Sequence, residues 1–109
     1  MEITDQELDQ LAREFVEKWT SYQNSHVQGE WPFERGSFCK GLIEKGLVCR
    51  HTRPQRGEYA IHHLYTGVAF FTGTGELAFT EAGLPFAKKI CELYLQKHFD
   101  AMQIIKVVY

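Results

Sequence analysis

The chain has 109 residues and a formal net charge of −2; 44% of its residues are hydrophobic, 24% charged and 14% aromatic. This length and composition predict one globular domain over residues 1–109, and they exclude a disordered chain or a protein that coats nucleic acid. No apolar run approaches the roughly 20 residues of a membrane span, and the acidic N-terminus lacks the apolar stretch of a signal peptide.

The three cysteines, Cys39, Cys49 and Cys91, have no spacing that indicates a disulfide framework. Cysteines without such a framework are usual in reducing compartments, whereas small secreted domains are often cross-linked. We therefore expect a cytoplasmic protein with no membrane partner.

The first predicted element is an amphipathic helix that starts after Thr4 and runs to about residue 22. Thr4 and Glu7 have the spacing of a capping box, and Ile3 and Leu8 have the spacing of a hydrophobic staple. Apolar residues then recur at helical spacing. They are Leu8, Leu11, Ala12, Phe15, Val16, Trp19 and Tyr22.

A second helix is predicted from Pro32 to about Lys45. Proline suits the first turn of a helix, because its missing N–H has no partner there. Gly36 and Gly41 weaken this helix by about 1 kcal/mol each relative to alanine. Gly46 is the left-handed residue with which many helices end.

Two β-prone runs, residues 47–52 and 58–65, follow this helix. They flank residues 53–57, where Pro54 and Gly57 favour a turn. We therefore expect the two runs to pair as a hairpin with a basic tip.

The rest of the chain predicts more short strands and a long helix. An apolar run over 68–71 and a glycine-rich turn over 72–75 lead to a strand at 77–79. A helix over about 83–99 and a short closing strand over 104–109 complete the chain. Together these elements predict an α+β fold, in which helices pack on a small antiparallel sheet and one long helix lies near the C-terminus.

Two segments are similar to a known family. Residues 41–48, GLIEKGLV, resemble the end of the recognition helix and the first wing strand of winged-helix (winged helix-turn-helix) regulators of the MarR and PadR types. Residues 77–83, LAFTEAG, resemble the entry to the helix that follows the wing in these regulators. The predicted basic hairpin lies between them, where a wing is expected. The resemblance covers roughly residues 33–99 and implies a winged-helix-like fold.

Positive charge is concentrated in the same part of the chain. Residues 1–34 have a net charge of −6, residues 35–63 of +4, and residues 64–109 of zero. If the winged-helix interpretation holds, basic side chains contact DNA phosphates and Ser37 is best placed to reach base edges. The alternative is a solvated face whose charges balance the acidic first helix. The predicted contact residues are Arg35, Ser37, Lys40, Lys45, Arg50, Arg53 and Arg56.

Two functions from different classes are compatible with these features. The first is a small, non-enzymatic winged-helix-like regulator that binds double-stranded DNA through a basic helix and a wing hairpin. The second is a winged-helix-like adaptor or inhibitor that binds another protein, of the kind with which phages or mobile elements block a host or defence complex such as a CRISPR effector. The basic hairpin favours DNA binding. The short segment over 25–32, which replaces a helix that such regulators usually have, favours a protein partner.

The resemblance also implies a homodimer, because the first and last helices of such regulators often pair across a two-fold axis. Both helices are apolar over more than one narrow stripe here. The residues expected in or beside this interface are Leu11, Phe15, Trp19, Leu93 and Tyr94.

We expect no metal and no other cofactor. Cys49 and His51 can share one face of a strand, but the neighbouring His62 and His63 point to opposite faces of theirs, so at most three ligands converge. The chain also has no serine–histidine–acid arrangement with a nucleophile elbow. The sequence therefore predicts a binding protein and no enzyme.

Overall fold

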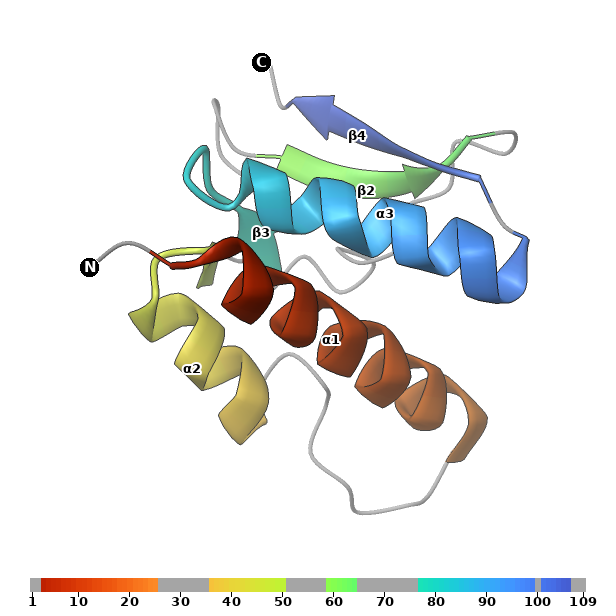
Figure 1. Cartoon of the computed structure of the whole chain (residues 1–109), viewed down its shortest axis with the longest axis horizontal. Helices are drawn as coiled ribbons and strands as arrows, with labels where there is room; N and C mark the ends of the chain where they lie inside the picture. The colour runs from red at the N-terminus through yellow and green to blue at the C-terminus, as the bar shows by residue number, and fades with distance from the viewer. Residues whose placement is uncertain (1–2, 26–35, 51–58, 65–76, 100, 107–109) are drawn as a thin grey trace.

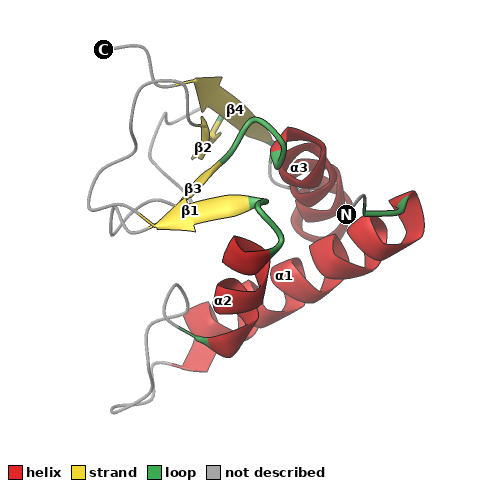
Figure 2. Cartoon of the chain, turned by 90° about the vertical axis from the view of Figure 1, so that its left-hand side faces the viewer, coloured by secondary structure: helices red, strands yellow, loops and turns green. Residues whose placement is uncertain are grey.

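The computed structural model describes residues 3–25, 36–50, 59–64, 77–99 and 101–106. Within these ranges, helices and strands follow one another in the order α1-α2-β1-β2-β3-α3-β4. Both views show the helices on one side of a small sheet (Figure 1 and Figure 2), which confirms the predicted α+β class. The elements are α1 Asp5–Ser25, α2 Ser37–Glu44, β1 Val48–Arg50, β2 Tyr59–His63, β3 Leu77–Phe79, α3 Leu84–His98 and β4 Met102–Lys106.

The described strands form one antiparallel sheet in the order β1-β3-β2-β4. Phe79 of β3 is paired with Val48 of β1 and also with Tyr59 of β2. The predicted pairing of residues 47–52 with residues 58–65 is therefore wrong, because β3 lies between β1 and β2.

The physical reason for this error is that turn residues let a chain reverse but do not select the neighbour of a strand. The end of β3 is hydrogen-bonded to the start of β1, where Thr80 N–H donates to Leu47 O at 3.2 Å. Both strands also bury apolar side chains, Val48 and Phe79, against the helices. The predicted turn at 53–57 and the predicted strand at 68–71 lie outside the described residues.

Helix α1 starts as predicted and extends about one turn further, to Ser25. The Glu7 N–H donates to Thr4 Oγ1 at 3.1 Å, which confirms the predicted N-cap. This hydrogen bond stabilises the N-terminus of α1, where the apolar stripe of the helix begins.

Helix α2 is shorter than predicted. Gly36 is its N-cap and has an extended backbone, so the helix begins at Ser37. The predicted start at Pro32 lies outside the described residues, and a helix running from there through Gly36 is ruled out. The low helix propensity of glycine explains why the helix does not extend N-terminally through Gly36. At the other end, Gly46 has a φ of 77° and is the predicted left-handed stop.

The first and last helices pack against each other within one chain and run in the same direction (Figure 1). Near their starts, Asp9 Oδ1 lies 3.8 Å from Lys89 Nζ. Near their ends, Thr20 Oγ1 lies 3.1 Å from His98 Nε2. Helix α3 then ends at Phe99, whose left-handed φ of 58° turns the chain toward β4.

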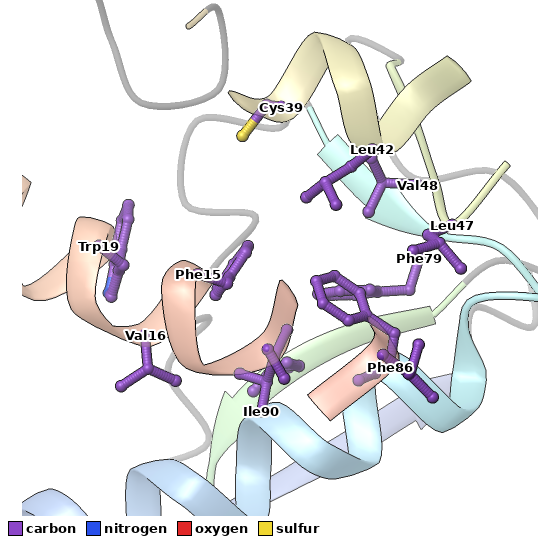
Figure 3. Packing of buried hydrophobic residues seen from close by; sticks show 14 of the residues in the cluster. Phe15, Val16, Trp19, Cys39, Leu42, Leu47, Val48, Phe79, Phe86 and Ile90 are labelled. Carbon is purple, nitrogen blue, oxygen red and sulfur yellow. The ribbon is translucent and has the colours of Figure 1, made fainter. Parts of the chain in front are cut away.

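Three phenylalanines from three different elements form the centre of the core (Figure 3). Phe15, Phe79 and Phe86 are fully buried, and their ring centroids lie 5.8–6.4 Å apart. Cys39 and Leu42 bring α2 onto the same cluster. Burial of rings and aliphatic side chains on this scale is the main stabilising term of the fold. Within the described ranges, no helix combines the length and the apolar composition that crossing a bilayer requires.

Candidate functional site

The two segments that carry the winged-helix resemblance are in direct contact. The Thr80 hydroxyl donates to Gly46 O at 2.6 Å and accepts a hydrogen bond from Gly83 N–H at 3.0 Å. The end of α2, the start of β1 and the entry to α3 therefore meet at a single side chain. We call the contact of residues 46–47 with residues 80–83 the junction.

Gly83 completes the junction by close backbone approach. A Cβ at Gly83 would lie 1.9 Å from Leu47 O and 2.7 Å from Leu47 C, so only glycine fits here. Its φ of −86° is open to any residue, so packing and not conformation demands the glycine. Glycine residues allow such approach because they have no side chain.

The outward face of α2 presents the described part of the predicted DNA contact. Cys39 and Leu42 are buried, which leaves Ser37, Lys40 and Glu44 exposed. These three residues recur at helical spacing and form one stripe. Exposed Lys45 follows directly after the helix. We call Ser37, Lys40, Gly41, Glu44 and Lys45 the α2 face.

Gly41 lies in the middle of the α2 face. A Cβ at this position would have no neighbour within 4 Å in the described part of the chain outside its own helix. The backbone is helical and φ is not positive, so neither conformation nor packing requires glycine. Gly41 is thus a helix-weakening residue on a solvent-facing surface.

The position of α2 is set by contacts on its inner side. In addition to buried Cys39 and Leu42, the Phe38 ring lies 5.7 Å from Lys18 Nζ of α1. At the other end, the junction holds Gly46 and Leu47. The helix is therefore anchored at both ends, which gives the α2 face a defined orientation.

The remaining predicted DNA contacts are not described. Arg35, Arg53 and Arg56 lie outside the described residues, and Arg50 is in β1, with a side chain that the structure does not describe. Because β1 pairs with β3, the strand that follows the predicted wing tip does not lie beside β1.

Most of the predicted dimer residues are used inside one chain. Phe15 is fully buried, and Trp19 and Tyr94 are also buried in the core. Leu11 and Leu93 pack against the core but are only partly buried. The structure therefore accounts for Phe15, Trp19 and Tyr94 without a second copy. The dimer remains a prediction, and its helix residues available to a partner are Leu11 and Leu93.

An open groove of about 370 Å³ lies between α1 and α3. Its lining mixes apolar and charged residues, and only one of them, Leu93, is among the interface residues predicted from the sequence. No periodicity signal identifies such a groove, since it arises from the crossing of two helices distant in sequence. It is lined by Arg13, Val16, Glu17, Leu93, Gln96 and Lys97.

The thiols have no reactive setting among the described residues. Cys39 is fully buried, and Cys49 Sγ lies 3.6 Å from Ala78 O. Burial, with a smaller contribution from Glu92, raises the pKa of Cys91 to about 11, so this thiol is protonated at neutral pH. Among the described residues, no three histidine, cysteine or acidic side chains converge as metal ligands would. His51, one of the metal ligands considered from the sequence, lies outside the described residues.

Thr20 and His98 form a hydroxyl–imidazole pair between α1 and α3, and the direction of its hydrogen bond indicates a structural role. The Thr20 hydroxyl donates its proton to Val16 O at 2.8 Å. The oxygen must therefore accept from His98 Nε2–H, at 3.1 Å. A histidine that acts as a general base accepts a proton from the hydroxyl, which is the reverse arrangement. The pair joins the ends of α1 and α3, and the His98 ring packs at a tilt against the Tyr94 ring, with 4.5 Å between ring centroids.

Comparison with known proteins gives no further assignment. No protein-family model, no curated protein and no solved structure matches this chain. Function is therefore inferred from the chemistry of its own residues.

Proposed function

We propose that this protein binds double-stranded DNA and that the α2 face is its contact surface. The observation that carries the proposal is Gly41, a half-buried helix glycine that nothing in the described residues requires. A glycine in this position costs about 1 kcal/mol of stability relative to alanine. A helix without a side chain at its centre lies closer to the floor or wall of a groove than any other helix can.

The charges of the α2 face fit phosphate groups. Lys40 and Lys45 are exposed, and neither forms an ion pair within the described residues. Two such cations on one short anchored segment position a protein on a duplex without reading its sequence. Ser37, one turn before Gly41, is the polar side chain available to base edges.

A fluorescence anisotropy titration of a labelled random-sequence duplex tests the proposal. We expect binding that weakens as salt rises from 50 to 200 mM, as counterion release requires. Replacing both Lys40 and Lys45 by alanine is expected to lower the affinity at least tenfold and to reduce the salt slope by about 2. The matched control is Lys88→Ala, which removes an exposed lysine from α3 instead.

The opposite result is also informative. The proposal is overturned if the wild-type protein does not bind the duplex at 50 mM salt, or if its binding does not weaken as the salt concentration rises to 200 mM. An equal loss in the double variant and in the Lys88 control indicates an unspecific charge effect, which also contradicts a contact through the α2 face.

A protein partner is the second candidate, and Glu44 is the observation that favours it. This acid is exposed on the α2 face between Lys40 and Lys45, where it repels phosphates but suits a mixed-charge protein surface. Glu44→Gln distinguishes the two candidates. If DNA is the ligand, this change tightens binding, because it removes a repulsion; if a mixed-charge protein surface is the ligand, it weakens binding.

A further inference from the structure

The outer edge of β4 is open in the part of the chain that the structure describes. β4 is the last strand in the sheet order and pairs only with β2 among the described strands. Figure 1 shows it at the border of the sheet, beyond β2. Natural proteins usually protect such an edge with prolines, bulges or charges, because its unpaired N–H and C=O groups pair readily with another strand.

The ladder shows which residues face the open side. Leu64 N–H donates to Ala101 O at 2.9 Å, and these two residues continue the register of β2 and β4. Hydrogen-bonded and non-hydrogen-bonded pairs alternate along an antiparallel ladder. Gln103 and Ile105, two and four residues after Ala101, therefore direct their backbone groups toward β2.

The three other residues of β4 direct their backbone groups outward. Met102, Ile104 and Lys106 each present an N–H and a C=O at the open edge. The strand has no proline, and its one charged residue is Lys106 at its end, whose Nζ lies 5.9 Å from the centre of the Tyr59 ring of β2. Residues 102–105 therefore lack the prolines and charges that usually protect an edge.

We propose that this edge pairs with β4 of a second copy of the chain and joins two sheets across a two-fold axis. The outward residues are symmetric about Ile104, so an antiparallel pairing centred there sets Ile104 opposite Ile104 and Met102 opposite Lys106. Each of these three pairs exchanges two hydrogen bonds, about six in total. No like charges face each other, and two β-branched side chains meet at the axis.

Exposed apolar side chains support an interface at the same place. The large hydrophobic residues that stand exposed among the described residues are Leu64, Leu95 and Phe99, at 46%, 48% and 87%. The Leu64 backbone is hydrogen-bonded to Ala101, which directly precedes β4. Phe99 lies two residues before Ala101 in the chain. The two-fold axis brings the partner's end of β4 beside Met102, next to Ala101 and Leu64. The inference is independent of DNA binding through the α2 face.

The test compares two variants of one residue. Ile104→Ala and Ile104→Pro both lose the isoleucine side chain, but only proline loses the outward N–H and adds a ring at the edge. Neither affects a hydrogen bond to β2. We expect the wild-type protein and Ile104→Ala to be dimers at about 100 µM by sedimentation equilibrium, and Ile104→Pro to be a monomer with an unchanged circular dichroism spectrum.

A second pair covers the case in which Ile104→Pro does not fold. Lys106 is exposed and also has an outward N–H, so Lys106→Pro is expected to give a monomer and Lys106→Ala a dimer. A dimer that survives the proline variants overturns the proposal in favour of another interface, such as the α1 and α3 residues. A wild-type monomer at 1 mM overturns it too and leaves the edge to an extended segment of another protein.

Discussion

Gly83 and Gly41 are two glycines whose surroundings are opposite: one is tightly packed, and the other has open space beside it in the described part of the chain. Gly83 lies at the junction, where a Cβ would collide with Leu47 O at 1.9 Å. Gly41 lies on the α2 face, where a Cβ would have no neighbour within 4 Å among the described residues outside its helix. The packing of the chain requires the first glycine, whereas nothing in its described part requires the second.

This difference distinguishes the residues that stabilise the fold from the residues that are available to a partner. At the junction, the backbones of β1 and α3 come together through one threonine and one glycine. The α2 face is the outer side of a short helix that is anchored on its inner side, and this outer side has no side chain at its centre. A residue that weakens a helix without helping the core points to a role outside the fold.

The largest expected effect is that of Gly83→Ala. The new methyl group has no space beside the Leu47 backbone, so the start of α3 must move away from β1. We expect a loss of at least about 3 kcal/mol in the free energy of unfolding, measured by urea denaturation. A loss below about 1 kcal/mol would contradict the close contact at the junction.

Thr80→Val tests the hydroxyl of the junction at nearly constant volume. Gly46 O loses a donor, and Gly83 N–H loses one of its two acceptors but keeps the Thr80 carbonyl, which is expected to cost about 1 to 2 kcal/mol of unfolding free energy. Thr80→Ser retains the hydroxyl and is the matched control. Equal stability of the valine and serine variants would show that these hydrogen bonds do not stabilise the junction.

Gly41→Ala is expected to act in opposite directions on stability and on binding. Alanine raises the free energy of unfolding by about 1 kcal/mol, because its helix propensity is higher and the methyl group meets no neighbour. The same methyl group holds the α2 face away from a duplex and lowers the DNA affinity several-fold in the anisotropy assay. A stabilised variant with unchanged affinity would remove Gly41 from the contact surface.

The smallest expected effect concerns Asp9, which links α1 to α3. A hydrogen bond from Arg13 lowers the pKa of Asp9, while the more distant Lys89 contributes less. Because the folded pKa is below the unfolded one, this stabilisation is present above about pH 4 and is lost as pH falls below it. Asp9→Asn is therefore expected to slightly reduce the pH dependence of the melting temperature between pH 4 and 2. An unchanged pH profile would show that the pairing is energetically neutral.

The helices are the part of this protein that local sequence signals determine. The capping residue Thr4 and the apolar spacing after it place α1, and Gly46 ends α2 as expected. These signals act over three or four residues and need no other part of the chain. The α+β class and the approximate positions of β1, β2 and β3 follow from the same kind of pattern.

The sheet order and the roles of individual residues depend on contacts between distant segments. A strand is selected as a neighbour by the backbone groups and apolar side chains that burial brings together, so β3 separates β1 from β2 although the turn chemistry favours a hairpin. For the same reason the sequence presents Phe15 as a dimer residue, whereas the structure buries it beside Phe79 and Phe86 of the same chain. Local pattern determines which residues are apolar; tertiary packing decides which surface they meet.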